Sequence, residues 1–148
     1  MMPTITAHEQ IEIGGITVRF LLEGDQTDGS LAMFEFGVAA GTTVPATHSH
    51  DGYDETIYGL EGVLTWTVDG ETHDVGPGEV LTIPRGVVHG FDNTDDGDAR
   101  ALAVVTPGIL GPAYFREIAV VLERAAGGPP DLAALAEVMR RHGLTAAM

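Results

Sequence analysis

The chain has 148 residues, the length of one domain, and a formal net charge of −15, which disfavours nucleic acid and anionic membranes as partners. It contains no Cys and no Lys, and neither of its two Ser lies in a Gly-x-Ser-x-Gly pattern, so disulfides, thiolate-bound metals and most covalent catalysis are excluded. No secretory signal or membrane-spanning run is visible, and we expect a cytoplasmic protein whose chemistry depends on His, carboxylates, Tyr or a bound ion.

Short apolar or alternating runs separated by turn residues fill residues 11–105 and predict β-strands. Asp69-Gly70 joins two extended segments and is typical of a tight hairpin turn. Many short strands at such regular spacing indicate a sandwich or a barrel. In chain order, the predicted strands are Ile16–Leu22, Leu31–Val38, Thr56–Leu60, Val63–Val68, Val80–Ile83, Val88–Phe91 and Ala101–Val105.

The pattern becomes helical after Pro107. Pro112 stands where a helix could start, and apolar residues then recur at helical spacing until the Gly-Gly-Pro-Pro stretch at 127–130. Asp131 can cap a second predicted helix, which ends at Gly143. We expect this helical pair to cover barrel surface or a dimer seam rather than to form a separate domain.

The sharpest local feature is the pair His48 and His50, separated by one serine. In an extended segment, residues two apart point the same way, so both imidazoles can meet one ion. The pair alone is a weak signal, because two solvated loop histidines would give the same pattern. Its surroundings decide between these interpretations.

Two motifs surround the pair, between Gly41 and Asn93. The first motif comprises Gly41, His48, His50, Glu55 and Gly62, and the second comprises Gly78, Pro84, Gly86, His89 and Asn93. In residue type and spacing they resemble the two motifs of the cupin superfamily, except that six residues rather than five separate Gly41 from His48. The chain looks like the small one-domain cupins grouped with quercetin dioxygenases, including their helical tail.

The resemblance implies an all-β fold, the double-stranded β-helix or jelly-roll cupin barrel built from two antiparallel sheets. The barrel is expected over residues 11–106, and a short C-terminal helical extension over residues 112–142. Both belong to a single cupin domain that spans residues 1–148.

A metal site is the second implication of the resemblance. The first motif supplies three ligands from adjacent strands, and His89 is expected to arrive from a facing strand. Asp54 also falls within the spacing allowed for the acidic ligand, but only Glu55 places Gly62 at the expected distance. The implied metal ligands are His48, His50, Glu55 and His89.

Three neutral imidazoles and one carboxylate suit one divalent ion per chain, such as Zn, Fe, Mn, Ni or Cu, and they leave coordination positions open for substrate. The leading hypothesis from the resemblance is a dioxygenase-like oxidoreductase that acts on a small aromatic or enolic molecule, with Glu55 as a proton acceptor. The alternatives are a non-redox cyclase, isomerase or lyase, and a small-ligand-binding module without turnover. A homodimer is also expected, because cupin barrels commonly pair sheet to sheet and Ile16–Leu22 offers an edge.

The remaining notable side chains have simpler interpretations. Asn93 is expected to satisfy local backbone groups, and Arg85 to be a surface charge rather than a contact for an anionic substrate. Alternation with Glu55 directs Ile57 inward. Solvent or a helix end accounts for the other histidines, His8, His73 and His142. Four aromatic residues are assigned to the core rather than to a pocket: Phe34, Phe36, Trp66 and Phe91.

Overall fold

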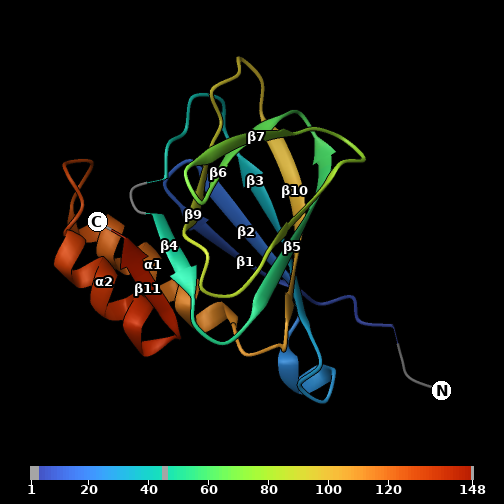
Figure 1. Cartoon of the computed structure of the whole chain (residues 1–148). Coiled ribbons are helices and arrows are strands. Elements are labelled where there is room, and N and C mark those ends of the chain that lie inside the picture. The colour runs from blue at the N-terminus through green and yellow to red at the C-terminus, as the bar shows by residue number, and fades with distance from the viewer. Residues whose placement is uncertain (1–3, 45–46, 148) are drawn as a thin grey trace.

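A computed structural model describes residues 4–44 and 47–147 of the chain. Strands are its main regular structure, and two helices precede the last strand (Figure 1). The elements are β1 Glu9–Ile13, β2 Ile16–Leu22, the 3-10 helix η1 Gly24–Gln26, β3 Ala32–Val38, β4 Thr47–His50, β5 Asp54–Glu61, β6 Leu64–Val68, β7 Glu71–Val75, β8 Val80–Ile83, β9 His89–Asp92, β10 Ala99–Thr106, α1 Pro112–Arg124, α2 Leu132–Arg141 and β11 Leu144–Ala147.

The strands form two antiparallel sheets that face one another across an apolar interior. One sheet has the order β1-β2-β3-β10-β5-β8, and the other has the order β11-β4-β9-β6-β7. Along β3 and β10 every second residue is buried, as the two-residue period of a strand with one face inward requires. The all-β jelly-roll barrel with a short helical extension, expected from the sequence, is confirmed.

The strongest local patterns predicted their strands well. The runs Ile16–Leu22 and Val80–Ile83 coincide with β2 and β8, and Asp69-Gly70 forms the tight turn between β6 and β7 with φ of 51° and 80°. Strands β1, β4, β7 and β11 were not among the predicted runs. In β7, four of the five residues are exposed, so the strand carries no alternating pattern to detect.

The expected sheet edge at Ile16–Leu22 is wrong. This segment is β2, which is hydrogen-bonded on both sides, to β1 and to β3. The edge belongs to β1, whose residues Glu9–Ile13 precede the first predicted run. The homodimer stays a prediction without this argument.

The helices close the side of the barrel between the edge strands β1 and β11. Helix α1 begins with Pro112, and the carboxylate of Asp131 caps α2 by accepting the Ala134 N–H at 3.0 Å. Helix α1 packs on β1, α2 packs on β11, and the helices pack on each other, as Figure 1 shows beside β4. The pair therefore covers barrel surface, as predicted. Neither described helix is long and apolar enough to cross a bilayer.

Asn93 ties the loops at one end of the barrel to each other. Its side chain is buried, and its amide group donates to the carbonyls of Val38, at 3.0 Å, and Gly97, at 2.9 Å. Its carbonyl accepts the N–H of Asp95 at 3.1 Å. The expected backbone role of Asn93 is confirmed.

The substitution Asn93→Ala is expected to lower the free energy of unfolding by about 2–4 kcal/mol, because it leaves backbone groups without their partners in a buried setting. Urea titration measures the change. The neighbouring Thr94→Ala, at an exposed position, serves as the control and should change stability by less than about 0.5 kcal/mol. Equal stability of the two variants would contradict the role of Asn93.

Candidate metal centre

Three histidines from two neighbouring strands form a compact cluster. His48 and His50 lie two apart on β4, and β4 pairs with β9 so that His48 is directly opposite His89. One ligand nitrogen from each ring lies within 4.8 Å of the others. The cluster therefore arises from strand alternation on β4 combined with one cross-strand pair.

The expectation that His89 comes from a facing strand is wrong. His89 lies in the same sheet as His48 and His50, and the residue that comes from the facing sheet is Glu55 on β5. The reason is that the chain leaves the sheet that contains β4 and β9 after His50 and enters the other sheet at Asp54. The two strands that carry the ligands of the first motif, β4 and β5, are therefore not neighbours.

Glu55 points into the barrel and faces the imidazoles. It is 5% exposed, and its Oε1 lies 3.5 Å from His89 Nε2 and 3.8 Å from His50 Nε2. Ile57, two residues further along β5, also points inward and is fully buried, as predicted. The structure thus brings together all four residues implied as ligands. Metal binding by these four residues stays a prediction.

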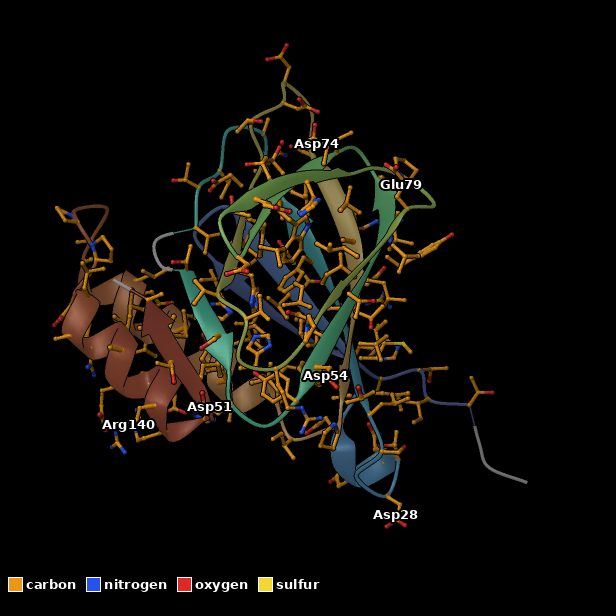
Figure 2. All side chains as sticks on the ribbon, viewed as in Figure 1. Asp28, Asp51, Asp54, Asp74, Glu79 and Arg140 are labelled. Carbon is orange, nitrogen blue, oxygen red and sulfur yellow. The ribbon has the colours of Figure 1, made fainter. Side chains whose placement is uncertain are left out.

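Asp54, the alternative acid, points outward and is used elsewhere. Its carboxylate accepts the backbone N–H of Arg85 at 2.8 Å and two guanidinium N–H groups, from Nε at 3.3 Å and Nη2 at 3.2 Å. These hydrogen bonds lower the pKa of Asp54. Figure 2 shows Asp54 at the start of β5. Arg85 is therefore a surface charge that pairs with Asp54, as expected.

The neutral state of His50 and the hydrogen bonding of His89 suit metal binding. Burial, with smaller effects of His89 and His48, lowers the pKa of His50 to about 2, so its imidazole is neutral at physiological pH. His89 Nδ1 lies 2.9 Å from the Val87 carbonyl. In the tautomer that donates to this carbonyl, Nε2 carries the lone pair, and this buried atom has no hydrogen-bond partner among the described residues. Such a donor set fits a borderline divalent ion.

In the metal-free protein, stability should fall as the pH drops below about 6.5. His50 in the unfolded chain takes up a proton near pH 6.5, whereas folded His50 does so only near pH 2, so acid favours the unfolded chain. Between these values His50 contributes a slope of up to about 1.4 kcal/mol per pH unit. Urea unfolding of chelator-treated protein at pH 7, 6 and 5 measures this slope. His50→Gln should reduce it, and an unchanged slope in this variant would contradict the assignment.

Tyr53 supports the ligand His50 and was missed by the sequence analysis. Its ring stacks on His50 with centroids 4.4 Å apart and an interplanar angle of 20°, and the residue is fully buried. Burial, followed by the charge of Glu55, raises the pKa of Tyr53. The only sequence signal was its position between the two ligand strands. Packing of this kind restricts the orientation of the His50 ring.

The cluster and Glu55 line a cavity of about 100 Å³. Its other walls are almost entirely apolar and come from the inner faces of both sheets and from α1, α2 and β11. The helical extension therefore completes the cavity. Wall residues from the extension and its approach include Leu110, Tyr114, Phe115, Ile118, Leu135 and Met139.

The assignment of four aromatic residues to the core is confirmed, but their exclusion from a pocket is wrong, because all four also line the cavity. In a barrel, the inward face of each strand is both core and cavity wall, so alternation alone cannot separate the two. Trp66, which is 1% exposed, packs on Phe91 with ring centroids 4.7 Å apart. The residues concerned are Phe34, Phe36, Trp66 and Phe91.

The other histidines lie outside the cluster. His73 is exposed on β7, as expected. His142 follows α2 as its C-cap residue and contacts the carboxylate of Glu117. His8 differs from its expected exposure, since it is half-buried.

Comparison with known proteins identifies the family. Residues 34–105 match the family model for the cupin domain. The chain belongs to the cupin superfamily. This cupin is 31% identical to quercetin 2,3-dioxygenase of Bacillus subtilis over an alignment 108 residues long. The alignment covers 66% of the chain and 31% of that enzyme, so the chain spans about a third of the enzyme's length.

Solved cupin structures agree with this assignment. The polyketide cyclase RemF of Streptomyces resistomycificus is 29% identical, with a TM-score of 0.59, and the match covers 75% of this chain and 88% of RemF. A sugar phosphate isomerase of the cupin superfamily from Silicibacter pomeroyi is 27% identical, with a TM-score of 0.54, over 64% of this chain and 60% of that one. These relatives carry different activities on a common fold.

Proposed function

We propose that this cupin is a metal-dependent enzyme, a dioxygenase-like oxidoreductase, that acts on a small aromatic or enolic molecule. The observation that carries the proposal is the placement of the histidine cluster and Glu55 in the wall of an otherwise apolar cavity. A polar cluster inside an apolar cavity is the usual form of a small-molecule site. The similarity to quercetin 2,3-dioxygenase supports the choice of reaction.

One divalent ion per chain is held by His48, His50, Glu55 and His89 in this proposal. When bound, the ion supplies a Lewis acid for a substrate oxygen and, if it is Fe, Mn, Ni or Cu, chemistry with O₂. The neutral state of His50 and the free lone pair of His89 Nε2 favour such binding. The single negative charge of Glu55 reduces the net charge that must be buried.

Glu55 is the proposed proton acceptor. Its carboxylate lies beside the cluster, where it can take a proton from a hydroxyl or an acidic C–H of a substrate held there. The aromatic wall, including Phe34 and Trp66, suits a flat apolar molecule and excludes bulk water. These residues would position the substrate and leave the carboxylate poorly hydrated.

A second candidate is non-redox cyclisation, isomerisation or elimination on the same site. The favouring observation is RemF, because the match covers 88% of that cyclase and so includes nearly its whole fold. The same residues would act, with Glu55 moving a proton and the ion serving only as a Lewis acid. The identity of the metal separates the candidates, since zinc does not support oxidation by O₂.

The test combines elemental analysis of the protein purified without added metal with an oxygen electrode. Flavonols, catechols and 1,3-diketones are incubated with the loaded protein under air, and a His48→Ala/His89→Ala variant serves as the control. Oxygen uptake that requires the wild-type cluster supports the dioxygenase. Product without oxygen uptake favours the second candidate. Tight binding without product leaves a binding module, and failure to bind metal after loading overturns the ligand set.

A further inference from the structure

Tyr114 is a cavity-lining residue that carries a hydroxyl group. It lies in the first turn of α1, is 6% exposed and is one of the lining residues. Across residues 4–44 and 47–147, no hydrogen bond to its hydroxyl is found. A polar group in an apolar, enclosed setting is costly unless it finds a partner, so the hydroxyl is expected to bond to whatever fills the cavity.

The ring of Tyr114 is held by its neighbours. Its centroid lies 5.1 Å from that of Phe115 and 5.6 Å from that of His142, both at steep interplanar angles. Contacts to Glu117 tie His142 at the end of α2 to α1. The direction of the hydroxyl is therefore fixed before a ligand binds, which reduces the entropy lost on binding.

Electrostatics keep this hydroxyl a donor. Burial, and then the charge of Glu55, raise the pKa of Tyr114, so the phenol is protonated at physiological pH. Glu55 and Tyr114 also line the same cavity. A molecule bound beside Glu55 is thus close to a neutral hydrogen-bond donor on the helical extension.

We propose that Tyr114 is a substrate-binding residue, whose hydroxyl donates a hydrogen bond to an oxygen atom of the molecule bound at the histidine cluster. This inference rests on the proposed function and narrows its substrate class to apolar molecules with an oxygen acceptor beyond the one at the cluster. It also gives α1 a role in specificity, because a chain with the barrel alone would lack this donor.

The test uses two ligands with one carbon skeleton, 1-phenylbutane-1,3-dione and butylbenzene, which has no oxygen. Their dissociation constants are measured by calorimetry for the wild type, Tyr114→Phe and Tyr58→Phe, both as purified and loaded with zinc. Tyr58 is the control, since the same change removes a hydroxyl from an exposed residue of β5 that does not line the cavity. Thermal unfolding of each variant verifies that it is folded.

Tyr114→Phe should weaken binding of the diketone about tenfold and leave binding of butylbenzene within about twofold, while Tyr58→Phe changes neither. Equal weakening of the binding of both ligands would show that Tyr114 only packs against them. Unchanged binding of both ligands would show that Tyr114 is not part of the binding site. Failure of the wild type to bind the diketone would also overturn the inference. Calorimetry measures binding and does not require turnover. If the protein passes this test but shows no catalytic activity, the proposed enzymatic function is refuted and the role of Tyr114 in binding is not.

Discussion

His89→Ala is expected to abolish stoichiometric metal binding. The wild type should hold about one ion per chain, and the variant should bind at least about 100-fold more weakly, since loss even of a residue that merely orients a ligand costs 10–100-fold. His89 matters most because the Val87 carbonyl fixes its tautomer and Nε2 faces Glu55. Elemental analysis after dialysis, with chelator competition for the affinity, measures the effect.

His73→Ala is the matched control for this substitution. It removes an imidazole of the same protein from an exposed strand and should leave the metal content unchanged. Near-UV circular dichroism of both metal-free variants distinguishes loss of a ligand from loss of the fold. A folded His89→Ala protein that still holds one ion would refute the ligand set, as would equal loss in both variants.

The members of the cluster could be predicted because the resemblance to the two cupin motifs covers all of them. His48 and His50 follow the two-residue period of one strand, and that period also places the side chains of Asp54 and Glu55 on opposite faces. The motif spacing chose Glu55, and the structure agrees, with Asp54 outside and paired with Arg85. Local alternation needs no knowledge of which strands are neighbours.

Strand neighbours were harder to predict, since periodicity reports which face of a strand is apolar but not which strands pair. His89 was therefore placed in the wrong sheet, and β2 was taken for an edge although the short β1 covers it. The same limit explains the aromatic residues. The inward position of Phe34 and Trp66 could be inferred from the pattern, but the cavity depends on how far apart the sheets and the helices lie.

The final strand, β11, supports the ligand strand β4, and no local sequence pattern predicts this role. Leu144–Ala147 is only four residues long, yet it pairs along β4 so that Leu144 is opposite His50 and Ala146 is opposite His48. Without it, the strand that carries two ligands would be the edge of its sheet. The helices were predicted from their caps and spacing. That they lead the chain back to β4 is evident only from the long-range pairing of β11 with β4.

Glu55→Gln is expected to lower turnover by about 10²–10⁴-fold while the protein still binds its ion at saturating metal. Gln keeps the size of the side chain and an oxygen that can face His50 and His89, but an amide cannot accept a proton. The loss should therefore appear in kcat more than in KM. Steady-state kinetics with any substrate found in the oxygen or product assays, together with metal analysis of the variant, measure both quantities.

Asp54→Asn supplies the control, because it makes the same chemical change one residue earlier, on the outer face of β5. It should keep nearly full activity, although it weakens the pair with Arg85, an exposed pair of the kind that contributes little to stability. If Glu55→Gln binds metal and retains wild-type turnover, the proton acceptor lies elsewhere. If the Glu55→Gln protein instead loses the ion even at saturating metal, the carboxylate acts mainly as a metal ligand. The loss of turnover would then result from the missing ion rather than from a missing base.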